Sequence, residues 1–205
     1  MVLPASQPRL FTVGHSDHAP ETFLALIRRH GVSAVADVRS SPYSRRNPQF
    51  NREALANELG RAEIRYVFLG NELGARRSEP ECYKDGKAEY ALIARAPLFL
   101  QGLERVRRGT DKFRIALLCA EKDPVTCHRS ILVCRHLREL VSPIQHIREE
   151  GRLEGHDELE SRLLALAGLP EGDLFHSRAE LLERAYDWQS ERIAYEEARS
   201  PEAVA

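Results

Sequence analysis

The sequence predicts a three-layer α/β domain with a mostly parallel sheet over residues 1–150, followed by an acidic helical extension over residues 151–205. Strand-like and helix-like segments alternate along the first part, as they do where helices cover both faces of a parallel sheet. The apolar run from Phe113 to Cys119 is typical of a strand buried on both faces of such a sheet. Beyond residue 150 only helical patterns remain, so the extension is expected to be an addition to the α/β body.

The first half of the body contains three of the expected strands. These strands are the short apolar runs Leu10–Gly14, Val32–Val38 and Ile64–Leu69. Pro20 fits the first turn of a helix, where a missing N–H costs nothing, and His30-Gly31 is a typical helix end. Asn51 is expected to cap the next helix by accepting a hydrogen bond from its first turn.

The second half of the body begins with residues 71–88, which are expected to form a long polar loop. Helical patterns follow from Tyr90 to Arg108, and the buried strand ends at Cys119. Thr126 is expected to cap a helix that starts at Cys127 and runs to about Leu140. Ile144–Ile147 is expected to be the fifth strand.

Two helices are expected in the extension. Leu159, Leu163 and Leu166 form one apolar stripe, and Ser177 with Glu180 has the spacing of a capping box. The last helix would then contain four apolar residues: Leu181, Leu182, Ala185 and Trp188.

Charge is unevenly divided along the chain. From Glu149 to Glu202 there are 15 acidic and 6 basic residues, a net of −9, which leaves +8 for the preceding residues. A basic body suits a phosphate-bearing partner, a small molecule or a nucleic acid, although solvated faces explain the same counts.

No apolar run reaches the ~18–20 residues that span a membrane, and no secretory signal is visible. Four cysteines without a disulfide pattern favour a reducing cytoplasm.

The turn after Cys119 carries the most reactive chemistry of the chain. Cys127 is the expected nucleophile, because a helix start with His128 and Arg129 beside it favours the thiolate. Glu121 is the expected general acid or base, and His128 completes the catalytic set. Cys127 is expected to be accessible, and Cys82 to be exposed in the polar loop. A small buried residue at a helix start is the structural alternative for Cys127.

Polar residues follow several of the expected strands at the same edge of the sheet, where ligands of α/β proteins bind. Arginines suit anions because the guanidinium matches a phosphate or carboxylate with two hydrogen bonds. The expected anion-binding residues are His15, Asp37, Arg39, Ser44, Arg45, Asn47 and Arg129. Salt bridges to Asp37 or Glu53 would explain two of the arginines equally well, and turn formation would explain Ser44 and Asn47.

Five motifs in order carry a resemblance to a known family. They are Val13-Gly14-His15-Ser16, Asp37-Val38-Arg39-Ser40-Ser41-Pro42, Ser44-Arg45-Arg46-Asn47-Pro48-Gln49-Phe50, Leu69-Gly70-Asn71-Glu72-Leu73-Gly74, and Cys119-Ala120-Glu121 with Cys127-His128-Arg129. Over roughly its first three-quarters the chain resembles the DUF488 family, a domain of unknown function. The resemblance implies an α/β fold and a polar site, and it assigns no activity.

Three chemistries compete for this site. The first is a hydrolase or transferase for a phosphate-bearing ligand that uses Cys127 or Glu121. The second is a redox or metal site, in which Cys119, Cys127 and His128 bind zinc or the thiols form a reversible disulfide. The seven-residue gap between the cysteines and the missing second C-x-x-C argue against structural zinc, so no residue is assigned as a metal ligand. The third is a binding module for nucleic acid without catalysis. The sequence names no cofactor and no oligomeric state.

Overall fold

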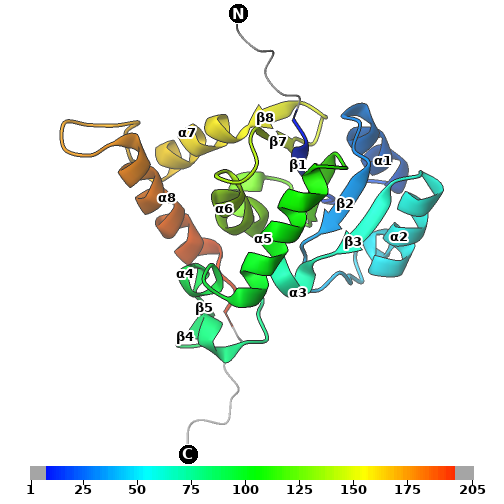
Figure 1. The fold of residues 1–205 in the computed structure, drawn as a ribbon, viewed down its shortest axis with the longest axis horizontal. Coiled ribbons are helices and arrows are strands. Elements are labelled where there is room, and N and C mark those ends of the chain that lie inside the picture. Colours follow the sequence, from blue (N-terminus) through cyan, green and yellow to red (C-terminus); the bar gives the residue numbers. More distant parts are fainter. Residues whose placement is uncertain (1–7, 197–205) are drawn as a thin grey trace, which may run out of the picture.

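The computed structural model describes residues 8–196 and contains a six-stranded sheet in the order β3-β2-β6-β1-β7-β8 (Figure 1). Its strands are β1 (Leu10–Gly14), β2 (Ala34–Asp37), β3 (Arg65–Phe68), β6 (Ile115–Cys119), β7 (Ile144–Ile147) and β8 (Leu153–Gly155). The first five of these strands run parallel, and β8 is an antiparallel edge strand that the sequence pattern did not reveal. The predicted α/β fold with a mostly parallel sheet is confirmed.

Helices cover both faces of this sheet (Figure 1). Helices α1 (Pro20–Arg29) and α2 (Arg52–Arg61) bury apolar residues such as Phe23 and Leu59 against one face. Helix α5 (Pro97–Thr110), the π-helical segment η4 (Arg129–Cys134) and α6 (Arg135–Leu137) pack on the other face. Alternate residues of the strands point to the two faces, so Leu117 and Leu118 belong to different cores. Within residues 8–196 no helix combines the length and apolarity needed to cross a membrane.

The segment expected to be a long polar loop contains regular structure. It includes α3 (Gly70–Leu73), the 3-10 turn η2 (Pro80–Cys82) and a hairpin of β4 (Tyr83–Lys84) and β5 (Lys87–Ala88), followed by α4 (Tyr90–Ile93). Cys82, expected to be exposed, is 1% exposed and belongs to the core. The pattern misled because elements of two to four residues are too short to show a period.

Helices α7 (His156–Leu166) and α8 (Arg178–Ile193) complete the described part of the chain. The expected capping box is present, since the Ser177 Oγ accepts from the Glu180 N–H and the Ser177 N–H donates to the Glu180 carboxylate. Leu163, Leu182 and Tyr186 are buried in the same core as α5 and the sheet. Leu166 departs from the expected stripe, because it is half exposed.

Ion pairs also connect α7 and α8 to the α/β body. Arg135 pairs with Glu183 and Asp187 of α8, and Arg138 pairs with Glu160 and Glu183. Part of the acidic surplus of the extension is therefore matched locally by arginines of the body. These pairs add to the apolar contacts between α8 and η4, and they orient the helix on the core.

Candidate functional site

The site lies in the connection that follows β6. Residues Pro124–Thr126 form the 3-10 turn η3, whose start is capped by the Asp123 carboxylate accepting from the Val125 N–H. The Thr126 hydroxyl donates to the Asp123 carbonyl instead of capping a helix. Cys127 has extended backbone angles, φ −129° and ψ 138°, and the helical segment η4 starts only at Arg129. His128 already has helical backbone angles, so the helix was predicted one residue too early, and Cys127 stands in front of it.

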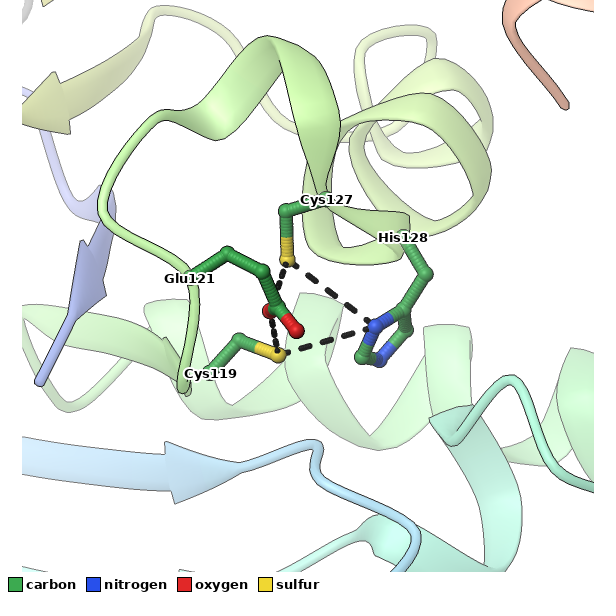
Figure 2. Close-up of side chains that lie close together, drawn as sticks. All are labelled: Cys119, Glu121, Cys127 and His128. Atoms are coloured by element: carbon green, nitrogen blue, oxygen red, sulfur yellow. Dashed lines mark hydrogen bonds between the residues drawn. The ribbon is translucent and has the colours of Figure 1, made fainter. Parts of the chain in front are cut away.

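Cys119 at the end of β6 and three residues of this connection direct their side chains to one point (Figure 2). The Sγ atoms of Cys119 and Cys127 lie 2.9 Å and 3.0 Å from the same Glu121 oxygen, Oε2. The Nδ1 atom of His128 lies 3.6 Å from the Cys119 sulfur and 3.9 Å from the Cys127 sulfur. One potential ligand atom from each of these residues lies within 4.8 Å of all the others. We refer to Cys119, Glu121, Cys127 and His128 as the donor cluster.

The body of the protein fixes how the donor cluster is oriented. The Nε2 atom of His128 lies 3.0 Å from the Val38 carbonyl oxygen, just beyond the end of β2. A carbonyl accepts only, so Nε2 carries a proton and donates it to Val38, and Nδ1 faces the two sulfurs. Metal-binding histidines are oriented in the same way by a carbonyl on the second ring nitrogen.

Arg129 supports the donor cluster from inside the core. Its side chain is fully buried, and its guanidinium donates to the Glu121 carbonyl at 2.7 Å and to the Thr12 hydroxyl at 3.3 Å. Its backbone N–H donates to the Cys127 sulfur at 3.5 Å. Arg129 thus connects β1 to the loop of Glu121 and places a positive charge behind the thiols.

Electrostatics divide the protons of the donor cluster unevenly. Burial raises the pKa of the Cys119 thiol, and the neighbouring Cys127 and Glu121 raise it further. Burial opposes ionisation of Cys127 as well, but the hydrogen bond from Cys119 and the charges of Arg129 and His128 outweigh it and lower its pKa. Burial and the charge of Cys127 raise the pKa of Glu121. A thiolate is therefore favoured at Cys127 over Cys119.

A cavity of about 370 Å³ opens onto the donor cluster. Its lining includes Cys119, Glu121 and His128, together with Arg39 and residues of the polar segments around 40–43 and 75–76. Cys127 is 1% exposed and sits behind these residues, so the expectation of an accessible Cys127 was wrong. The reason is local: the thiol turns inward from an extended backbone toward Cys119, not outward from a helix start.

His15, Asp37 and Arg39 form a second group at the same sheet edge. The Asp37 carboxylate accepts from the Arg39 guanidinium at 2.8 Å and 2.6 Å, and from the Tyr66 hydroxyl at 2.8 Å. The Arg39 NH1 lies 3.2 Å from His15 Nε2, and its NH2 also donates to the Phe50 carbonyl. This guanidinium is therefore neutralised by a buried salt bridge, which matches the alternative explanation given above for the arginines.

The other expected anion-binding residues lie apart from the cavity. The Ser44 hydroxyl accepts from the backbone N–H groups of Arg46 and Asn47, as in a turn. Arg45 is exposed, and the described lining of the cavity includes neither it nor Ser44 and Asn47. Asn51 precedes α2 as expected, but its side chain accepts from the Ser44 N–H and does not cap the helix.

Acid should destabilise the fold through its buried histidines. Burial and the charge of Arg39 lower the pKa of His15 to about 4, and burial also lowers the pKa values of His146 and His156. The unfolded chain binds these protons below pH ~6.5, so stability is complete above that value and falls as the pH drops toward 4. His15 alone should account for about 3 kcal/mol.

Urea unfolding of metal-free protein between pH 7.5 and pH 4.5 measures this dependence. The variant His15→Gln should show a shallower loss of unfolding free energy than the wild type over this range. A wild-type free energy of unfolding that stays constant across it would contradict the assignment of neutral, buried histidines.

Two cavity residues had no signal in the sequence. Arg76 lies in the segment expected to be a loop, and the sequence pattern predicts Tyr90 only as the start of a helical segment. Tyr90 is 4% exposed and lines the cavity. A buried tyrosine whose hydroxyl is available to a ligand can mark a binding site, but the burial of Tyr90 beside the cavity is visible only in the structure.

Comparison with known proteins places the chain in a family. A family model described as "Domain of unknown function DUF488" matches residues 19–135, more than half of the chain. The match includes β2, β6 and the whole donor cluster, whereas α7 and α8 lie beyond it. Neither the curated proteins nor the solved structures gave a match. The chain therefore belongs to the DUF488 family, a family without an assigned activity.

Proposed function

We propose that this protein binds a divalent transition metal, zinc in the first place, through Cys119, Glu121, Cys127 and His128. The observation that carries the proposal is the convergence of four donor atoms within 4.8 Å. Two thiolates, an imidazole and a carboxylate are the ligand types that zinc prefers. The cavity in front of the cluster would give a small ligand access to the metal.

The spacing of the donor atoms fits a tetrahedral ion. Zinc bonds of ~2.3 Å to sulfur and ~2.0 Å to nitrogen or oxygen separate neighbouring ligand atoms by ~3.5 Å. The sulfur–nitrogen distances of 3.6 Å and 3.9 Å are close to this value. The shorter sulfur–oxygen distances of 2.9 Å and 3.0 Å are hydrogen bonds that metal coordination would replace, with a shift of about 0.5 Å.

Burial favours a ligand role for Cys127 over a nucleophilic one. A nucleophile must meet its substrate, but Cys127 is 1% exposed and the cavity reaches Cys119 and Glu121 first. A metal ligand needs no exposure, and the buried charge of Arg129 stabilises the thiolate that binds the metal. Arg129, at the start of η4, therefore stabilises the thiolates that would bind the metal.

A hydrolase or transferase for a phosphate-bearing ligand is the second candidate. The lowered pKa of Cys127 beside His128 is the observation that favours it, because this pairing activates thiols in other enzymes. Cys127 would act as the nucleophile and Glu121 as the general acid or base, and Arg39 would line the substrate cavity. Turnover of a phosphorylated substrate by metal-free protein, lost in Cys127→Ser, would favour this candidate over the metal centre.

The metal proposal predicts one tightly bound zinc ion per chain after purification and dialysis. Cys119→Ser, Cys127→Ser and His128→Ala should each weaken zinc binding by at least about 100-fold, since each removes a ligand. Cys82→Ser is the matched control, because Cys82 is equally buried and lies outside the donor cluster. Elemental analysis gives the stoichiometry, and competition with a chelating dye gives the affinity.

The folding of each variant is checked by its circular dichroism spectrum and its melting curve. Glu121→Gln keeps the shape of the side chain and tests the fourth ligand without a large packing change. Wild-type protein that takes up no zinc, or a Cys82→Ser variant that loses as much zinc as Cys127→Ser, would overturn the assignment.

A further inference from the structure

Tyr90 is a buried residue whose hydroxyl has no protein partner. Its side chain is 4% exposed, and it lines the cavity in front of the donor cluster. Among residues 8–196 no hydrogen bond to the Tyr90 hydroxyl is formed. The hydroxyl itself is reached by solvent from the cavity, so a ligand in the cavity can replace water as its hydrogen-bond partner.

The position of Tyr90 connects it to the donor cluster. Burial raises the pKa of Tyr90, and the charge of the Cys127 thiolate raises it further. Tyr90 lines the same cavity as Cys119, Glu121 and His128. The hydroxyl keeps its proton in this environment and is available as a hydrogen-bond donor.

Arg76 brings a positive charge to the same cavity. Its guanidinium stacks over the Tyr195 ring at 4.4 Å, and its backbone N–H donates to the Ser40 hydroxyl. No ion pair of this guanidinium occurs within the described part of the chain. Stacking holds the planar group in place and leaves its N–H donors free for a ligand.

We propose that this cavity binds an oxyanion, a phosphate or carboxylate group, through the Tyr90 hydroxyl and the Arg76 guanidinium. Arg39, the other arginine of the lining, is already neutralised by Asp37, so Arg76 supplies the charge that selects an anion. Two donors of this kind fit the oxygens of a phosphate or carboxylate better than a neutral group. The inference rests on the proposed function in one respect: the ligand would lie over the metal bound by the donor cluster.

Titration of the full-length protein with inorganic phosphate tests the proposal. The protein is loaded with one equivalent of zinc, and amide chemical shifts report binding at millimolar phosphate. Tyr90→Phe removes only the hydroxyl and Arg76→Gln removes only the charge, and each should weaken phosphate binding about 10-fold. Arg45→Gln is the matched control, because Arg45 is an exposed arginine outside the cavity. A parallel titration with acetate separates a phosphate site from a carboxylate site.

The outcomes separate this inference from the metal proposal. Zinc uptake without binding of phosphate or acetate overturns the oxyanion site and leaves the metal centre standing. Oxyanion binding that depends on Tyr90 and Arg76 in a protein that takes up no zinc supports the oxyanion site and overturns the metal centre. Binding that Arg45→Gln weakens as much as Arg76→Gln shows a diffuse surface charge effect and overturns the site.

Discussion

Truncation of the chain after residue 150 should abolish cooperative folding. Helices α7 and α8 contribute their apolar side chains to the same core as η4 and the sheet. The buried residues that would be lost include Leu159, Leu163, Leu164, Leu181, Leu182, Ala185 and Tyr186. Loss of one large buried side chain costs about 2–5 kcal/mol, so the loss of seven buried side chains exceeds the ~5–15 kcal/mol that stabilise a typical domain.

Denaturant unfolding of the truncated protein, followed by circular dichroism, measures this effect. Phe175→Ser is the control within the extension, because Phe175 lies between α7 and α8 and is 85% exposed. That substitution should change the free energy of unfolding by less than about 0.5 kcal/mol. A soluble truncated protein with a cooperative unfolding transition would show instead that residues 151–205 are a separable addition, as the helical pattern beyond residue 150 predicts.

Gly14→Ala should destabilise the fold and disturb the donor cluster at the same time. A Cβ atom at Gly14 would lie 1.9 Å from the carbonyl oxygen of Glu121, which is too close for any contact. This carbonyl also accepts the 2.7 Å hydrogen bond from Arg129. Both β1 and the Glu121 loop would have to move apart, so the substitution should cost about 3 kcal/mol or more.

Gly60→Ala is the matched control for this prediction. Gly60 lies in α2, and nothing lies within 4 Å of its added Cβ atom. Alanine should therefore stabilise the helix by up to about 1 kcal/mol. Zinc affinity should fall in Gly14→Ala and stay at the wild-type value in Gly60→Ala. Equal stability and equal zinc affinity of both variants would contradict the close approach of Gly14 to Glu121.

The parallel sheet could be predicted because its central strands, β1, β2 and β6, are buried along their whole length. Strand β6 (Ile115–Cys119) is buried on both faces, and Ile115 and Ala116 belong to different cores in the structure. Burial on both faces leaves a continuous apolar run that is visible in a single sequence. The same signal is missing from β8, a three-residue edge strand that begins with Leu153 and ends with Gly155.

The donor cluster could be predicted only in its composition. The motif near Cys127 showed which reactive groups share one turn, but their geometry depends on contacts with distant residues. His128 is oriented by the carbonyl of Val38, and Arg129 is held by Thr12. These partners lie about a hundred residues away in sequence, and no local pattern encodes the directions in which the side chains point.

The inward rotation of Cys127 explains why its exposure was predicted incorrectly. A helix start at this residue would have turned the thiol toward the loop, as thiols at helix N-termini often are. The extended backbone at Cys127 instead directs the sulfur to the Glu121 carboxylate and to Cys119. One change of backbone conformation therefore favours a metal ligand over an accessible nucleophile.

X-ray absorption at the zinc K-edge tests the metal centre most directly. The full-length protein, loaded with one equivalent of zinc, should show two sulfur ligands at ~2.3 Å and two nitrogen or oxygen ligands at ~2.0–2.1 Å. Cys127→Ser should reduce the sulfur contribution by half if it retains zinc. A spectrum with nitrogen and oxygen ligands alone would place the zinc elsewhere and would contradict a centre formed by Cys119, Glu121, Cys127 and His128.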